Sequence, residues 1–209
     1  ATDTGADAGL TNVFAYEARA EEGGYVNGVM AGLLTQSGTI GVVGPVPAGD
    51  ALLYINGFQQ GALASNPEAN VVIAYTGSFG DTALAAETAQ TQISAGADVL
   101  TGSAQQVVGA IDAAQAAGAV WFGTQSDQSV NWPSTVVASQ VFNWAPTLGQ
   151  MVDKILIGTY GGTAYEISLA NGGLRIIYGG VELSADVMAA ADAAIAGIID
   201  GSIVVAQEL

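Results

Sequence analysis

The segment TIGVVGPVPAGDALLYINGFQQGALASNPEANVVIAYTGSFGD (39–81) carries the pattern that decides the fold. It contains two short apolar runs, TIGVV (39–43) and NVVIAY (70–75), which are typical of strands buried on both faces of a sheet. Each run is followed by a loop that ends in an aspartate, Asp50 or Asp81, and an aspartate at that place can cap a helix. Alternating short strands and capped helices predict an α/β fold with a mainly parallel sheet.

The same alternation continues on both sides of this segment. Further strands are predicted over 12–18, 98–100, 119–123 and 136–139. Helices are predicted over 21–34, 51–65, 82–95, 105–117 and 146–157, with a last one from the cap Ser184 to about 199. Near the end, Asn171-Gly172 separates the apolar runs 164–169 and 174–178, and this pattern predicts a β-hairpin.

The charged and reactive side chains exclude several classes of protein. The 209 residues include 3 basic and 19 acidic side chains, which give a net charge of −16, so nucleic acid and anionic membrane surfaces are not expected partners. The chain has neither His nor Cys, which removes Ser-His-Asp and Cys-His catalysis, structural zinc and disulfides. We expect no metal and no cofactor, and we do not expect an enzyme.

Polar loops follow the predicted strands at 44–50, 76–81, 101–106, 123–128 and 138–144. In an open parallel sheet, the loops at the carboxyl ends of the strands line the binding crevice. These loops carry Ser, Thr, Gln, Asn, Phe and Trp, which suit a neutral polar ligand such as a nucleoside, a sugar or an amide. The alternative is ordinary helix capping and turn formation, which explains Asp50, Asp81 and Ser103 well but explains Trp144 beside Phe142 less well.

Several segments resemble the basic membrane protein family, whose members are solute-binding proteins of ABC importers and in some cases bind purine nucleosides. The similarity runs from Tyr16 to the C-terminus in unchanged order. Its segments are YEARAEEGGYVNGVMAGLLTQSGTIGVVG (16–44), NGFQQGA (56–62), YTGSFGDTALAAETAQTQISAGADVLTGS (75–103), FGTQSDQ (122–128) and LANGGL (169–174).

The resemblance implies a type I periplasmic-binding-protein fold, in which two α/β lobes close on a ligand about a hinge. On that template, residues 36–120 and 160–209 form a complete second lobe, and residues 1–20 and 121–158 form a partial first lobe. Crossings between the lobes are expected near 20–36, 121–127 and 158–163. The strands near 13–18, 120–123 and 136–139 would then form an incomplete sheet without the N-terminal part of the first lobe. That part is lost, cleaved or supplied by another chain.

The resemblance also implies the ligand site. Nucleoside-binding relatives have an aspartate where this chain has Gln125 and a lysine where it has Phe142, so a less hydroxylated or more aromatic solute is expected. We expect ligand contacts from Ser103, Gln105, Gln125, Phe142 and Trp144, with Asp127 holding the hinge loop.

Binding by hinge closure is expected, without a chemical reaction. The expected partners are a small-molecule solute and an ABC permease, and the expected location is periplasmic or extracellular, associated with the cell surface. An alternative is an extracellular structural protein that self-associates through the incomplete first lobe, because exposed strand edges pair readily.

Overall fold

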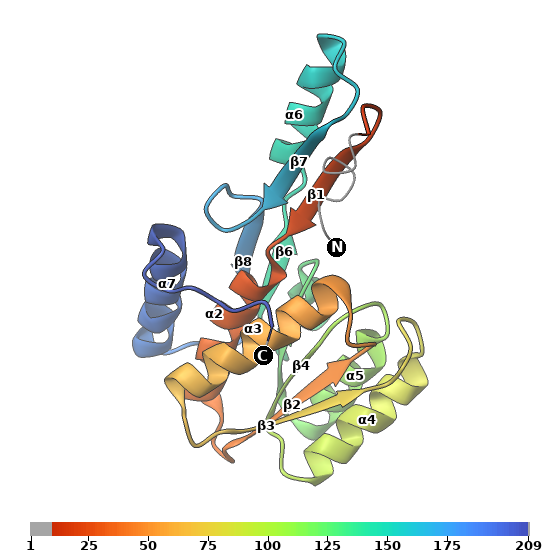
Figure 1. The fold of residues 1–209 in the computed structure, drawn as a ribbon. Helices are drawn as coiled ribbons and strands as arrows, with labels where there is room; N and C mark the ends of the chain where they lie inside the picture. The colour runs from red at the N-terminus through yellow and green to blue at the C-terminus, as the bar shows by residue number, and fades with distance from the viewer. Residues whose placement is uncertain (1–9, 209) are drawn as a thin grey trace.

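The structure is a computed structural model that describes residues 10–208. It contains a six-stranded sheet in a compact body and a two-stranded sheet that projects from it (Figure 1). The six-stranded sheet has the order β3-β2-β4-β5-β6-β8; its first five strands are parallel, and β8 runs antiparallel to β6. The predicted α/β class is confirmed. The strands are β2 (Thr39–Gly44), β3 (Asn70–Tyr75), β4 (Val99–Gly102), β5 (Val120–Gly123), β6 (Val136–Phe142) and β8 (Leu174–Tyr178).

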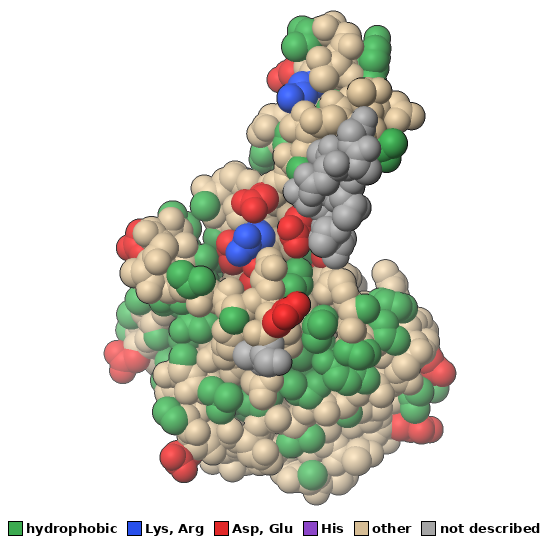
Figure 2. All heavy atoms as spheres, in the orientation of Figure 1, with side chains coloured by type: hydrophobic (Ala, Val, Ile, Leu, Met, Phe, Trp, Pro, Cys, Tyr) green, Lys and Arg blue, Asp and Glu red, His purple; other side chains and the backbone are tan. Residues whose placement is uncertain are grey.

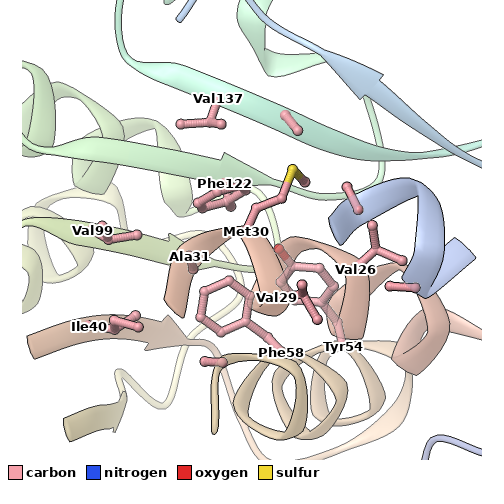
Figure 3. Close-up of a cluster of buried hydrophobic side chains, with 14 of the residues drawn as sticks. Val26, Val29, Met30, Ala31, Ile40, Tyr54, Phe58, Val99, Phe122 and Val137 are labelled. Atoms are coloured by element: carbon pink, nitrogen blue, oxygen red, sulfur yellow. The ribbon is translucent and has the colours of Figure 1, made fainter. Parts of the chain in front are cut away.

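Helices cover both faces of the six-stranded sheet. Neighbouring strand residues such as Val42 and Val43, or Phe122 and Trp121, belong to different buried clusters because successive side chains point to opposite faces. The first face packs against α2 (Ala20–Leu34), α3 (Gly49–Ser65) and α7 (Ala185–Asp200), and Figure 3 shows the side chains of this cluster. The second face packs against α4 (Thr82–Ser94) and α5 (Val107–Ala117).

Glycines allow α2 and α3 to pack backbone against backbone. A Cβ at Gly28 of α2 would overlap the carbonyl oxygen of Phe58, and a Cβ at Gly57 of α3 would overlap that of Glu21. Helix axes can come this close only where no side chain separates them. The sequence motif NGFQQGA therefore fixes the separation of the two helices.

A projecting arm is formed by β1 (Phe14–Ala18), β7 (Thr163–Ile167) and α6 (Ala145–Leu156) (Figure 1). The two strands pair in parallel, and Lys154 of α6 donates a hydrogen bond from Nζ to Thr163 Oγ1 at 2.9 Å. Among residues 10–208, β1 and β7 pair with each other only. The apolar side chains of α6 are left exposed, including Leu148, Val152 and Leu156. Among all the described residues, 10–208, no helix has both the length and the apolar content needed to cross a membrane.

The incomplete sheet that we predicted from the strands near 13–18, 120–123 and 136–139 is not formed by those three strands. We assigned β5 and β6 to the partial first lobe, but β5 pairs with β4, and β6 pairs with β5 across a register shift, inside the six-stranded sheet. The partner of β1 is β7, from the part of the chain that we assigned to the second lobe. The physical reason is that the apolar runs of β5 and β6 are buried on both faces by helices of the body, and the arm offers no such cover.

The chain passes between the two sheets at three places: after β1, after β6 and between β7 and β8. The first adjoins the start of the crossing that we predicted near 20–36, whereas the other two lie away from those that we predicted near 121–127 and 158–163. The passages contact one another. Arg19 donates from its backbone N–H to Ile167 O at 2.9 Å, and Asn143 donates to Gly173 O at 2.7 Å. Figure 2 shows acidic side chains gathered around a basic one where the arm meets the body; the ion pairs of Arg19 with Glu21 and Glu166 lie there.

The predicted hairpin around Asn171-Gly172 is wrong, although a tight turn is present. Asn171 Oδ1 accepts hydrogen bonds from the N–H groups of Ser168 and Gly173, and Gly172 has a φ of 70°. The flanking strands then diverge: β7 pairs with β1 and β8 pairs with β6. The sequence correctly predicted the turn, but pairing with strands that are distant in the sequence determined where β7 and β8 lie.

Two of the three helix caps that the sequence predicted are present in the structure. Asp81 accepts a hydrogen bond from the N–H of Leu84 at 3.0 Å, and Ser184 accepts one from Val187 at 3.3 Å. The expected cap at Asp50 is wrong, because α3 begins at Gly49, two residues earlier than predicted, and its N-cap Ala48 makes no side-chain bond. Asp50 therefore lies in the first turn of the helix.

Asp98 provides a pH-dependent stabilisation at the turn between α2 and β2. Burial would raise the pKa of Asp98, but hydrogen bonds from Thr35 Oγ1 (2.7 Å) and the N–H groups of Gln36 and Ser37 outweigh it and lower the pKa. A lowered carboxyl pKa stabilises the fold above the unfolded value of about 3.9, and this contribution is lost as the pH falls through the folded value.

We expect Asp98→Asn to lower the free energy of unfolding at pH 7, and the difference from the parent to shrink as the pH falls below about 4. Urea titrations of both proteins from pH 3 to pH 7 measure this. A difference that stays constant over that range would contradict the assignment.

Candidate functional site

The carboxyl ends of β2, β3, β4 and β5 meet at one edge of the sheet. From β2 the chain moves outward to β3 and then returns to the other side of β2 as β4, so the direction of winding reverses between β2 and β4. Ligands of open α/β sheets bind in the crevice at such a reversal. The loops after β2 and β4 line a pocket at this point.

This pocket, named the switch-point pocket, has a volume of about 280 Å³. One wall is the start of α3, another is the loop after β4, and single residues come from the loops after β3 and β5. Phe79, from the loop after β3, is 51% exposed. The residues that line the pocket are Ala48, Gly49, Asp50, Ala51, Phe79, Ser103, Ala104, Gln105 and Gln125.

A second pocket, also of about 280 Å³, adjoins the first. We name it the η1 pocket because the short 3-10 helix η1 (Gln128–Val130) lies beside it. Ala104, Gln105 and Gln125 line both pockets. The remaining lining residues are Val107, Val108, Ile111, Thr124, Ser126, Asp127, Gln128, Asn131 and Trp132.

The backbone is strained at the boundary of the two pockets. Ala104 and Gln125 both have a φ of 72°, and in the described part of the chain they alone among non-glycine residues have a positive φ. Such a conformation costs on the order of 1–3 kcal/mol and persists where the surrounding structure imposes it, commonly at ligand sites. The strain therefore makes the loops after β4 and β5 candidates for a ligand site.

A buried polar network supports the loop after β5 from below. Asn27 Nδ2 donates to Tyr54 Oη at 3.0 Å and to Gly123 O at 3.1 Å, and Tyr54 Oη lies 2.8 Å from Thr101 Oγ1. Burial raises the pKa of Tyr54 to about 12, so its hydroxyl stays protonated at neutral pH. The network ties α2, α3, β4 and β5 together directly beneath Gln125.

The loop that carries Phe79 is held against the loop after β4. Thr76 Oγ1 donates to Gln106 Oε1 at 2.5 Å, and the backbone N–H of Gln106 donates to Phe79 O at 3.0 Å. Gln106 is completely buried. Phe79 is thus a surface aromatic ring on a fixed backbone, which is suited to stacking against a ligand.

The electrostatics of both pockets favour ligands without negative charge. None of the described residues that line them is Lys or Arg, and each pocket contains one carboxylate, Asp50 or Asp127. Burial raises the pKa of Asp50, and the nearby carboxylate of Glu21 adds to the shift. Asp50 Oδ1 is buried without a hydrogen-bond partner among the described residues, so it can accept a hydrogen bond from a ligand.

The six predicted site residues are divided between the pockets and the base of the arm. Ser103, Gln105 and Gln125 line the switch-point pocket, and Asp127 lines the η1 pocket, where its Oδ1 caps η1 by accepting from the N–H and hydroxyl of Ser129. The rings of Phe142 and Trp144 contact each other, and Trp144 also contacts Tyr16 of β1. The structure does not bring Phe142 and Trp144 into either pocket, although the N–H of Phe142 lies 3.4 Å from Gln125 O.

Sequence reasoning missed Phe79, Asp50 and Trp132. Phe79 lies in a strand-end loop that we quoted, and a large aromatic residue between Ser and Gly in such a loop was an available signal. Asp50 was interpreted as a cap. Trp132 follows an irregular segment without strand or helix periodicity, and no pattern in the sequence indicated it.

The fold and the two pockets define an α/β protein with a candidate ligand site at the switch point of its sheet. A family model described as an ABC transporter substrate-binding protein, PnrA-like, matches residues 2–207. A purine-binding protein of Brucella abortus is 33% identical over 149 residues, which are 71% of this chain and 42% of that protein. Basic membrane protein D of Borreliella burgdorferi is 32% identical over 59% of this chain and 37% of that protein.

The solved structure of an ABC-transporter solute-binding protein from Conexibacter woesei has the same fold. Its TM-score is 0.82 at 24% sequence identity, over 99% of this chain and 70% of that chain. The chain belongs to the family of PnrA-like substrate-binding proteins of ABC transporters. The resemblance to basic membrane proteins and the type I periplasmic-binding-protein fold are both confirmed. The chain spans about two fifths of the length of the curated relatives that it matches.

Proposed function

We propose that the chain binds a small neutral solute with a flat ring, in the nucleoside-like class, as part of an ABC importer. The observation that carries the proposal is the switch-point pocket, where loops from four parallel strands meet around two strained residues and one exposed aromatic ring. Family membership supports the role, and the relative from Brucella abortus is a purine-binding protein.

The polar groups of the pocket support this class of solute. The side-chain amides of Gln105 and Gln125 each offer donors and an acceptor, Ser103 offers a hydroxyl, and Asp50 offers an acceptor. A ring bearing neutral amide or amine groups satisfies such a set, and its face can stack on Phe79. Phosphorylated solutes are disfavoured, because none of the described residues that line the pocket is basic and the chain has a net charge of −16.

Closure about the base of the arm would complete the site, as we infer from the three adjoining chain passages. In this proposal the ligand-bound, closed form is selected by its extra contacts with the ligand. Phe142, Trp144 and Tyr16 lie at this junction and would respond to closure without touching the solute. Delivery to an ABC permease places the protein on the outer side of the cytoplasmic membrane. Binding of this kind makes and breaks no covalent bond.

Self-association is a second candidate, favoured by the arm. α6 exposes Leu148, Val152, Ile155 and Leu156, and the strands β1 and β7 each have an edge unpaired among residues 10–208. Open edges and apolar faces of this kind gain by pairing with a second copy. Light scattering separates the candidates: a stable dimer or larger assembly supports this one, and a monomer of about the 20.8 kDa chain mass contradicts it.

Isothermal titration calorimetry with adenosine, inosine and adenosine monophosphate tests the proposed function. We expect one-site binding of the two nucleosides and at least tenfold weaker binding of the nucleotide, because its phosphate brings negative charge to a site without cations. Gln125→Gly should weaken nucleoside binding while preserving the backbone, since glycine adopts a φ of 72° without strain. Absence of binding by both nucleosides, or preference for the nucleotide, would contradict the proposal.

A further inference from the structure

The η1 pocket has a different character from the switch-point pocket. Its lining combines apolar side chains, among them Val108, Ile111 and Trp132, with polar ones that include Thr124, Asp127 and Asn131. Its volume of about 280 Å³ is just below the range of about 300–1,000 Å³ that is typical for drug-sized ligands. A ligand the size of a single sugar ring fits within this volume.

The indole of Trp132 is fixed in place. Its Nε1 donates to Asp112 Oδ1 at 2.8 Å, and its backbone N–H and carbonyl bond to Gln128 and Val136. The indole N–H is thereby satisfied, so the ring offers the pocket an apolar surface of fixed orientation. An aromatic face of this kind packs against the C–H face of a sugar ring.

Two of the polar lining residues have groups that lack partners. Thr124 is only 2% exposed, and its hydroxyl is buried without a hydrogen-bond partner among the described residues. An unsatisfied buried hydroxyl is costly, and a ligand that bonds to it removes this cost. Asp127 uses Oδ1 to cap η1, and its Oδ2 accepts no hydrogen bond from the described residues.

The mixture of donors and acceptors selects among ligands. Thr124, Gln125 and Asn131 each both donate and accept hydrogen bonds, and Asp127 only accepts. A cation cannot use the donors, and an anion would face Asp127 without a compensating basic group. A neutral polyol uses both kinds of group, because each hydroxyl also donates and accepts.

We propose that the η1 pocket is a binding site for a neutral monosaccharide, distinct from the switch-point pocket. In this site Trp132 packs against the face of the sugar, Asp127 Oδ2 accepts from one hydroxyl, and Thr124 and Asn131 bond to others. The site does not depend on the proposed nucleoside function. Gln105 and Gln125 line both pockets, so the two sites share a boundary.

Titration of the purified protein with D-glucose and D-ribose, followed by calorimetry and tryptophan fluorescence, tests the proposal. Choline serves as a cationic probe of similar size. We expect saturable binding of at least one sugar and no saturable binding of choline. Failure of both sugars to bind, or binding of choline in their place, would overturn the assignment.

Two matched variants locate the sugar. Asp127→Asn keeps an oxygen that can cap η1 but loses the charge-assisted bond, so sugar affinity should fall roughly tenfold to a hundredfold. Asp81→Asn makes the same change at the cap of α4, outside both pockets, and should leave sugar affinity unchanged.

Asn131→Ala changes an exposed residue and should also weaken sugar binding, without altering the circular dichroism spectrum. Equal affinities in the Asp127 and Asp81 variants would place the sugar elsewhere. The separate nucleoside titration reports on the switch-point pocket, so failure of one proposal is distinguishable from failure of the other.

Discussion

Gly57→Val is expected to lower the free energy of unfolding by about 3 kcal/mol or more, at the upper end of the overpacking range. A Cβ at Gly57 would overlap the backbone carbonyl of Glu21, and backbone atoms cannot rotate away as a side chain can. The only relief is separation of α2 from α3, which disrupts the cluster shown in Figure 3. Such a loss is a large part of the roughly 5–15 kcal/mol that stabilises a typical domain. Urea unfolding followed by circular dichroism measures it.

Gly149→Ala in α6 is the matched control. No atom lies within 4 Å of the position a Cβ would take there, so alanine should stabilise the helix slightly, by roughly 0.5–1 kcal/mol. If Gly57→Val unfolded at the same urea concentration as the parent, the close contact between α2 and α3 would be contradicted.

Phe79→Ala is expected to weaken nucleoside binding roughly tenfold to a hundredfold. The ring is 51% exposed and lines the switch-point pocket, so its removal takes away a stacking surface without opening a cavity in the core. Aromatic stacking contributes about 0.5–1.5 kcal/mol beyond the apolar area that it buries, at about 25 cal/mol per Å². Calorimetric titration with adenosine measures the change in affinity, and thermal unfolding checks that the variant is folded.

Tyr160→Ala provides a comparison at another exposed aromatic ring. Tyr160 is 61% exposed, follows α6 on the arm and lines neither pocket, so its removal should leave adenosine affinity unchanged. Equal effects of the two variants, or none from Phe79→Ala, would count against stacking in the switch-point pocket.

Most strands and helices of the body could be predicted from the sequence, because their patterns are local. β2, for example, is an apolar run of the kind that is buried on both faces, and Asp81 makes the backbone bond that its place before α4 predicted. The assignment of β5, β6 and β7 to sheets was wrong. An apolar run indicates that a strand is buried, but it does not indicate which strands lie beside it. The turn at Asn171-Gly172 illustrates the same limit, since its local geometry is compatible with strands that diverge.

The candidate site was predictable where it follows from topology. The carboxyl ends of parallel strands lie at one edge, and this rule correctly brought together the loops 101–106 and 123–128, which carry Ser103, Gln105 and Gln125. The same rule included the loop 138–144, but β6 extends to Phe142, and the structure places the rings of Phe142 and Trp144 at the base of the arm. The positive φ of Ala104 and Gln125 could not be predicted, because neither residue type requires that conformation.

The most direct test of the central claim is a map of backbone amide chemical shifts while adenosine is added to the isotopically labelled protein. The claim predicts saturable shifts concentrated on Gly49, Phe79, Ser103, Gln105 and Gln125, which come from four separate loops and meet in the switch-point pocket. Shifts that do not saturate, or that gather on the exposed face of α6 while these five amides stay still, would contradict it.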